Sequence, residues 1–302
     1  MQLLNPAGRL HTLRSAVDAL PTVARRPVLG IMRFSAARLC DVLDAVDALT
    51  GRRDPLRPPR RMIGFVGSNS IVGSDYHAIG RDLVALAVRY AGLQPDHVVL
   101  EVGSGTGRIA ASLTGVLSPI GRFEGFDIGL DGVAWCQSNI TPRFPRFHFQ
   151  RADIFNASYN PKGRETAAAY RFPFDDATFD VVMANSVFTH MYRKDTAHYL
   201  AEIARVLRPG GRSFLTHFLL TAESREALNA AWSAIPFAFP VPDGLTVNAN
   251  VPEAAIAIDL DAVRSDYAAA GLVMEPVLGG RWSGNAEGAH FQDIVVARKP
   301  LG

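Results

Sequence analysis

The chain contains few cysteines, few lysines and no long apolar run. Cys40 and Cys136 are its two cysteines, too few for a disulfide framework or a zinc site, so we expect buried thiols in a reduced, cytoplasmic protein. The longest uncharged stretch, 227–242, has 16 residues and three prolines, whereas a membrane span needs about 20 apolar residues. The first 20 residues hold no continuous apolar segment, so no secretory signal is predicted.

Arginine provides nearly all of the positive charge. Only 3 of the 31 basic residues are lysine, a composition typical of a GC-rich bacterial genome. Residues 1–61 carry 11 arginines and 5 aspartates, a net charge of +6, which leaves −4 for the rest of the chain. The arginines are scattered, and no aromatic residues interleave with them. This pattern favours a solvated basic helical surface, with an anionic partner as the alternative, and no nucleic acid is expected.

The apolar patterns divide the chain into two parts. Residues 1–61 predict a helical N-terminal extension, with Leu10, Leu13, Val17 and Leu20 at helical spacing. Residues 62–302 predict one α/β domain, because short apolar strands alternate with helices, as in a parallel sheet covered on both faces. Strands are expected at 97–102, 122–128, 147–154, 179–186 and 212–220, and helices at 74–92, 108–117, around 135 and at 195–207.

The last third of this domain departs from the alternation. Residues 221–258 begin with a helix, contain an uncharged, proline-broken segment, and are expected to form an insertion that caps the substrate site. Trp232, Phe237 and Phe239 in this segment fit a lid over an apolar acceptor or the interface of a homodimer. A helix near 259–270 and two antiparallel strands, 272–282 and 291–299, should follow.

The most informative motif is Glu101-Val-Gly-Ser-Gly-Thr-Gly107, between a predicted strand and a predicted helix. Its glycines permit a tight turn that brings backbone amides and a helix N-terminus against a ligand. A dinucleotide site of the G-x-G-x-x-G type would need glycine at 108, where Arg108 stands. Glu101 would repel a phosphate, but it can accept hydrogen bonds from an ammonium group or a water. The motif therefore favours S-adenosylmethionine (SAM) over a nicotinamide dinucleotide.

Two further carboxylates end the next predicted strands. Asp127 is placed to hydrogen-bond the hydroxyl groups of a ribose, and Asp153 to accept from an adenine amino group. Ligands of open α/β sheets bind at the carboxyl ends of the strands, so the three acids outline one site. For each acid alone, a loop carboxylate or a helix cap is an equally good explanation.

These segments resemble the class I SAM-dependent methyltransferases in order and spacing: LEVGSGTG, EGFDI, RADI, FDVVMANSVFTHM and RVLRPGGR. The resemblance covers about 74–220 and extends to the last two strands, and the stretch from YNPKG to FTHM is similar to an uncharacterised bacterial branch of the superfamily. It implies a Rossmann-like fold whose mostly parallel, seven-stranded sheet has an antiparallel last strand. It also implies SAM as the cofactor and methyl transfer as the reaction.

The resemblance assigns a role to each residue of the cofactor site. Gly103, Ser104 and Gly105 would pack against the methionine portion of SAM, and Glu101 would hold its ammonium group. The remaining residues would be Asp127 at the ribose, Ile128, Asp153 and Ile154 around the adenine, and Asn185 with Ser186 below the sulfonium.

His190, just after the fourth predicted strand, is the candidate general base, the alternative being a histidine that fixes its loop. His217 and Tyr76 are weaker site candidates, because either can belong to the core. No cluster of His, Cys and Asp has metal-ligand spacing, so no metal is predicted. The strand end Ala184-Asn185-Ser186-Val187 lacks the Asn-Pro-Pro-Tyr-type motif of nucleic-acid amino methylation.

We therefore expect a cytoplasmic enzyme that moves a methyl group from SAM to an O or N atom of a small molecule, such as a sugar or a secondary-metabolite scaffold. The alternatives are a SAM-binding regulatory or scaffold protein without transferase activity, and a nicotinamide-dependent dehydrogenase.

Overall fold

The computed structural model describes residues 37–63, 76–157 and 159–301, and the chain divides into two compact units, 1–75 and 76–302. In the first unit, residues 37–49 form a helix that is followed by α3 (Arg60–Ile63). The guanidinium group of Arg60 joins the two helices through ion pairs of 2.6 Å with both Asp44 and Asp47. The predicted helical stripe at 10–20 lies outside the described residues.

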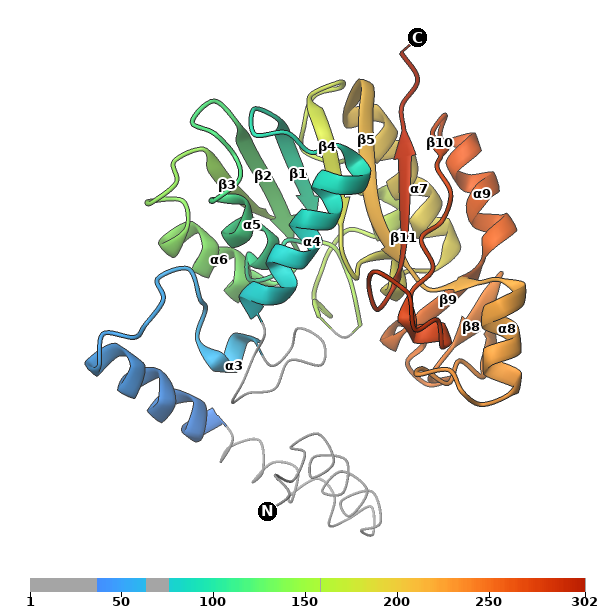
Figure 1. Ribbon diagram of the computed structural model, residues 1–302, viewed down its shortest axis with the longest axis horizontal. Coiled ribbons are helices and arrows are strands. Elements are labelled where there is room, and N and C mark those ends of the chain that lie inside the picture. The colour runs from blue at the N-terminus through green and yellow to red at the C-terminus, as the bar shows by residue number, and fades with distance from the viewer. Residues whose placement is uncertain (1–36, 64–75, 158, 302) are drawn as a thin grey trace. The chain divides into compact units, whose positions relative to one another are not determined.

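The second unit contains a seven-stranded sheet in the order β10-β11-β5-β4-β1-β2-β3 (Figure 1). The strands from β1 to β5 run parallel, and β11 is antiparallel to both β5 and β10. The expected sheet, mostly parallel with an antiparallel last strand, is thus confirmed. Its strands are β1 (Val98–Val102), β2 (Arg122–Asp127), β3 (Phe147–Arg151), β4 (Phe179–Ala184), β5 (Leu207–His217), β10 (Val273–Met274) and β11 (Asp293–Arg298).

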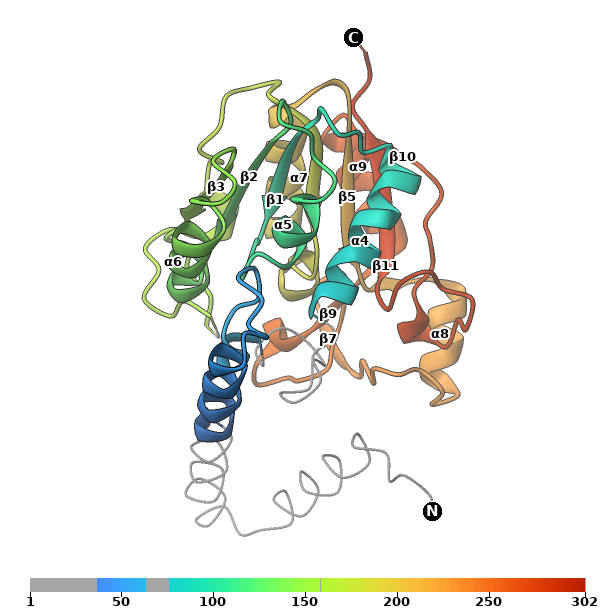
Figure 2. The ribbon, with the colours of Figure 1, turned by 60° about the vertical axis from the view of Figure 1, so that its left-hand side comes forward.

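Helices cover both faces of this sheet (Figures 1 and 2). One face carries α4 (Tyr76–Ala91), α5 (Arg108–Leu113) and α6 (Leu130–Asn139), and the other carries α7 (Arg193–Val206) and α9 (Leu260–Ala269). The central strand β4 is buried along its whole length, which explains why its residues other than Asp180 are apolar on both faces rather than alternating. Four short 3₁₀ helices complete the unit: η1 (Ala167–Ala169), η2 (Phe188–His190), η3 (Pro252–Ala254) and η4 (Arg281–Ser283).

A second, four-stranded sheet lies beyond the carboxyl end of β5 (Figure 1). Its order is β6-β9-β8-β7, and it is accompanied by α8 (Ala222–Asn229), which Thr221 and Ser224 begin with reciprocal side-chain-to-backbone hydrogen bonds. Phe237 is buried with Phe218 and Trp282 in a separate core of this part. The strands are β6 (Leu219–Leu220), β7 (Phe239–Val241), β8 (Gly244–Thr246) and β9 (Ile256–Asp259).

Two predicted strands are wrong in extent. The strand expected at 212–220 breaks at Phe218, because the Asp293 carboxylate accepts the Leu219 N–H at 2.7 Å and turns the chain into the second sheet. The strand expected at 272–282 shrinks to β10, since Pro276 has no N–H to donate to a ladder. Of the three aromatic residues expected to form a lid or an interface, Phe237 is instead core, whereas Trp232 and Phe239 are 62% and 44% exposed.

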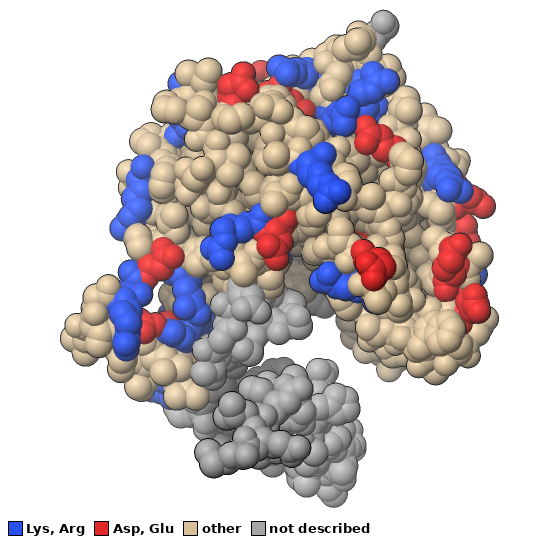
Figure 3. All heavy atoms as spheres, in the orientation of Figure 1, with Lys and Arg blue, Asp and Glu red and all other residues tan. Residues whose placement is uncertain are grey.

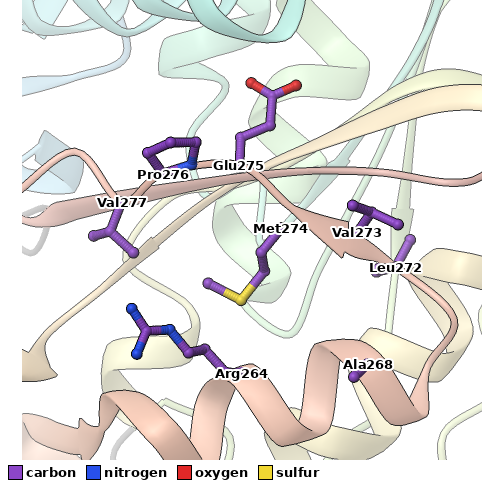
Figure 4. A pocket seen from close by; sticks show the side chains of 8 residues that line it. All are labelled: Arg264, Ala268, Leu272, Val273, Met274, Glu275, Pro276 and Val277. Carbon is purple, nitrogen blue, oxygen red and sulfur yellow. The ribbon is translucent and has the colours of Figure 1, made fainter.

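Two features of the described surface are its mixed charges and an apolar groove. On the face shown in Figure 3, acidic and basic side chains are interspersed. An open apolar groove of about 560 Å³ lies between α9 and the segment after β10, with Met274 and Val277 in its wall and Arg264 beside it (Figure 4). Val273 pairs with Arg298 at the far end of β11, so this groove lies at the amino edge of β5. Within the described ranges, no helix is long and apolar enough to cross a bilayer.

Candidate functional site

The glycine-rich loop turns sharply at the carboxyl end of β1. Gly103 has a positive φ of 75°, and a Cβ atom there would lie 2.3 Å from Val187 Cγ2, so only glycine fits. The N–H groups of Gly103 and Ser104 donate to the Phe126 carbonyl of β2. Tyr76 is fully buried and donates its hydroxyl to the Thr106 carbonyl at 2.7 Å. Tyr76 therefore braces the loop from α4 as a core residue.

Glu101 is the penultimate residue of β1 and precedes this loop. It is 3% exposed, and its Oε2 atom has no hydrogen-bond partner among the described residues. Burial raises the pKa of this carboxyl well above its usual value, and the charge of Arg108 opposes that rise. A buried carboxylate oxygen without a partner is costly in a folded protein, and a cationic N–H donor is the group that would satisfy it.

Asp127 ends β2 and holds the loop from the side. Its Oδ2 accepts the Gly105 N–H at 2.7 Å, and its Oδ1 accepts the Gly129 N–H at 2.6 Å. Burial raises the pKa of this carboxyl, and the two N–H donors oppose the rise. Each carboxylate oxygen keeps further lone-pair capacity for a ligand hydroxyl. The neighbouring Ile128 is partly buried against the main core.

Asp153 follows β3 at the same edge of the sheet. Its Oδ2 accepts from Arg164 Nε at 2.6 Å, and this contact lowers the pKa of Asp153. Ile154 is buried and bridges to Glu165, so the chain between them forms a closed loop. The ion pair with Arg164 was not predicted, because a partner eleven residues away in a loop leaves no periodic signal.

Asn185 and Ser186 follow β4 directly. Ser186 has a positive φ of 58°, a conformation that is uncommon for residues other than glycine. Its N–H donates to Thr216 Oγ1 at 2.8 Å, and its hydroxyl donates to Gln292 Oε1 at 3.1 Å. Asn185 Nδ2 lies 3.4 Å from Ser186 Oγ, whereas Asn185 Oδ1 is buried and has no partner in the described part of the chain.

His190, in η2, is held by the segment that was expected to cap the site. Its Nδ1 lies 2.8 Å from the carbonyl oxygen of Glu253 in η3 and must donate to it. This contact fixes the tautomer in which Nε2 carries the free lone pair. Burial lowers the pKa of His190 below 6.5, so the ring is neutral at pH 7. Tyr159 contacts it edge-on, with ring centroids 6.0 Å apart.

His217 is a core residue. It is 2% exposed, its Nε2 lies 3.1 Å from the Tyr267 hydroxyl, and burial lowers its pKa to about 3. A ring so buried and already paired with the Tyr267 hydroxyl is not a candidate base. Among the described residues, no group of three or more His, Cys, Asp or Glu is arranged to hold a metal.

The sheet order brings most of these residues to one place. The strand β1 lies between β2 and β4, so Glu101, the glycine loop, Asp127 and Ser186 meet at their carboxyl ends. The chain order of the strands reverses here, where open α/β sheets bind their ligands. Asp153 lies one strand further out, and His190 lies beyond β4 next to the second sheet.

The sequence of this region is similar to a known family. Residues 100–215, from β1 to β5, match the family model described as a methyltransferase domain. This segment is thus a methyltransferase domain by its sequence, and the sheet has the topology of the class I SAM-dependent methyltransferases. The solved structure of the PH0226 protein from Pyrococcus horikoshii has the same fold, with a TM-score of 0.51 and 17% identity over 77% of this chain and 94% of that one.

Three relatives match part of the chain. An O-methyltransferase of Penicillium expansum is 36% identical over 129 residues, which are 42% of this chain and 40% of that protein. A phthiotriol/phenolphthiotriol dimycocerosates methyltransferase of Mycobacterium tuberculosis is 36% identical over 37% of this chain and 34% of its own length. A 27-O-demethylrifamycin SV methyltransferase of Amycolatopsis mediterranei is 50% identical over 56 residues, 18% of this chain and 20% of that protein. The matched regions thus span 40% or less of these relatives.

Proposed function

We propose that the protein binds SAM at the carboxyl edge of its main sheet and transfers the methyl group to an oxygen atom of a small molecule. The observation that carries this proposal is the buried, unpartnered Glu101 oxygen behind a glycine loop, within a segment that matches the methyltransferase domain. Oxygen is preferred over nitrogen because two of the relatives are named for O-methylation.

The residues present fit this cofactor. Glu101 Oε2 would take the ammonium group, and Asp127, with Ile128 beside it, would bind the ribose hydroxyls. When bound, SAM supplies a methyl group on a positively charged sulfur, which keeps the bonding electron pair as the methyl leaves. The loop residues Gly103, Ser104 and Gly105 would pack on its methionine portion, Asp153 and Ile154 would flank the adenine, and Asn185 and Ser186 would lie below the sulfonium.

His190 would act as the base in this reaction. Its neutral ring exposes the Nε2 lone pair, because Nδ1 donates to Glu253. The acceptor oxygen forms the new bond to carbon, and Nε2 takes the proton that this oxygen loses. The segment 221–258, which contributes Glu253, would then be part of the acceptor site. Most of the rate enhancement would come from aligning acceptor and methyl group.

Two titrations and one transfer assay test the proposal. We expect calorimetry to show that the parent protein binds SAM, and that it does not bind NAD more tightly than SAM. D127A should weaken SAM binding at least about tenfold, because the charged hydrogen-bond acceptor is lost. Unchanged affinity in D127A would refute the ribose contact, and tighter binding of NAD would favour a dehydrogenase. With methyl-labelled SAM, binding without transfer to any hydroxylated acceptor would favour a regulatory or scaffold protein.

A further inference from the structure

A directed chain of hydrogen bonds crosses the carboxyl edge of the sheet beside the proposed methyl position. Asn185 Nδ2 faces Ser186 Oγ at 3.4 Å, and the Ser186 hydroxyl donates to Gln292 Oε1 at 3.1 Å. We call these three residues the relay. Its two ends are open: Asn185 Oδ1 is a buried acceptor, and Gln292 Nε2 is a donor, and neither has a partner among the described residues.

The relay is costly for the fold. Ser186 holds a φ of 58°, and a residue other than glycine in this sparsely populated conformation destabilises the fold. Asn185 Oδ1 is buried without a partner in the described part of the chain, and an unsatisfied buried polar atom keeps its full desolvation cost. Both costs fall at one point of the molecule, where a ligand would make the missing bonds.

Gln292 is rigidly positioned from both sides. Its own N–H donates to His290 Nδ1 at 3.1 Å. The next residue, Asp293, accepts the N–H groups of Gly280 and Leu219 at 2.7 Å and the Trp282 indole N–H at 2.8 Å. A side chain on such a fixed backbone is suited to select a ligand, because little conformational entropy is lost on binding.

We propose that the relay selects a vicinal diol as the methyl acceptor, with Gln292 as the specificity-determining residue. A hydroxyl group both donates and accepts, so one hydroxyl of the diol closes the chain by accepting from Gln292 Nε2 and donating to Asn185 Oδ1. Its neighbour then faces His190 as the oxygen to be methylated. This inference rests on the proposed function, since it places the acceptor beside the SAM site.

Binding to the complex with S-adenosylhomocysteine tests the relay without turnover. The probes are two matched pairs: 2,3-dihydroxynaphthalene with 2-naphthol, and cyclohexane-1,2-diol with cyclohexanol. We expect the diol of at least one pair to bind about tenfold more tightly than its mono-ol, the effect of one hydrogen-bonded group in a site built for it. Q292E, which removes the donor, and Q292M, which removes both polar atoms, should abolish this preference.

The control is Q94E, the same chemical change at an exposed glutamine just before β1, at the opposite edge of the sheet. It should keep the preference, and all three variants should bind S-adenosylhomocysteine as the parent protein does. Absence of a diol preference in both pairs, or its survival in Q292E and Q292M, would overturn the relay's role. A parent protein that binds no S-adenosylhomocysteine would instead refute the proposed function.

Discussion

At the scale of single residues, the site is made of groups that the fold leaves incompletely satisfied. Glu101 keeps a buried oxygen without a partner, and Asn185 does the same next to the strained Ser186. In a domain whose net stability is commonly about 5–15 kcal/mol, such defects are substantial. Buried atoms without a partner also occur away from this edge, for example at Ser118 and Thr196, so the site is marked by their coincidence with the glycine loop and the strand-end acids.

Glu101 gives the first prediction. Because its folded pKa is raised, the folded protein without SAM binds more protons than the unfolded chain, and stability falls as pH rises above about 4.3. E101Q removes the titrating group that causes this fall in stability. The free energy of unfolding of E101Q, measured in urea, should therefore increase relative to that of the parent protein as pH rises from 5 to 8. Its affinity for SAM should fall at least about tenfold.

The matched control is E226Q, on the exposed side of α8. It should follow the parent protein at every pH. Parallel stability curves for E101Q and the parent protein would show that burial does not disfavour the Glu101 charge.

The second prediction at the residue scale concerns His190. H190Q should lower kcat by about 10²–10⁴, the usual contribution of a general base, and leave SAM affinity unchanged. Because the pKa of His190 is below 6.5, the base stays unprotonated at neutral pH, and kcat/KM of the parent protein should be level above pH 6.5 and decline only below it. H148Q, at a half-exposed histidine of β3, is the control. Full activity in H190Q would exclude His190 as the base and would leave it only the role of fixing its loop.

At the scale of elements, the strands were predictable where burial is continuous. The strands β1 and β4 are largely apolar, a glycine loop follows β1, and β2 ends at Asp127, while the order of the strands follows from the superfamily resemblance. The break at Phe218 was not predictable, because residues on both sides of it are buried and the cause is a carboxylate 75 residues away. Gln292 was missed for a similar reason: it reaches the site from the start of an antiparallel strand, without a motif of its own.

Asp293 hydrogen-bonds residues at the junction of the two sheets, so its substitution should lower the stability of both. Three N–H groups, from Gly280, Leu219 and Trp282, converge on its carboxylate. In D293N an amide group replaces one acceptor oxygen, so at least one buried donor loses its partner. We expect a loss of about 2–4 kcal/mol in the free energy of unfolding by urea.

D261N, at a side chain that is 86% exposed, should change this free energy by less than about 0.5 kcal/mol. A D293N protein as stable as the parent would mean that the junction between the sheets is held by apolar packing alone.

At the scale of the whole molecule, the two units differ in how much core they contain. The main core cluster is drawn entirely from residues of the second unit, including residues of β1, β4, α7 and β11. A chain without residues 1–60 should therefore keep one cooperative thermal transition, with its midpoint within about 4 °C of the full chain.

The same deletion tests the role of the basic extension. SAM affinity, measured by calorimetry, would fall if residues 1–60 take part in the cofactor site, and would stay the same if they serve an anionic partner or only the surface. A truncated chain that fails to fold would contradict the independence of the second unit's core.

The pairing of β6 with β9 limits how the segment between these strands can be replaced, in protein design and in evolutionary divergence. The chain enters this sheet at β6 and leaves it by β9, and the two pair directly, Leu219 with Ile258 and Leu220 with Asp259. Because the two strands are parallel, the segment between them leaves the carboxyl end of β6 and returns at the amino end of β9, three residues or about 10 Å back along the strand. A replacement for residues 221–255 would have to span that separation and to supply again the Glu253 carbonyl that fixes His190 and the Phe237 ring that packs on Trp282.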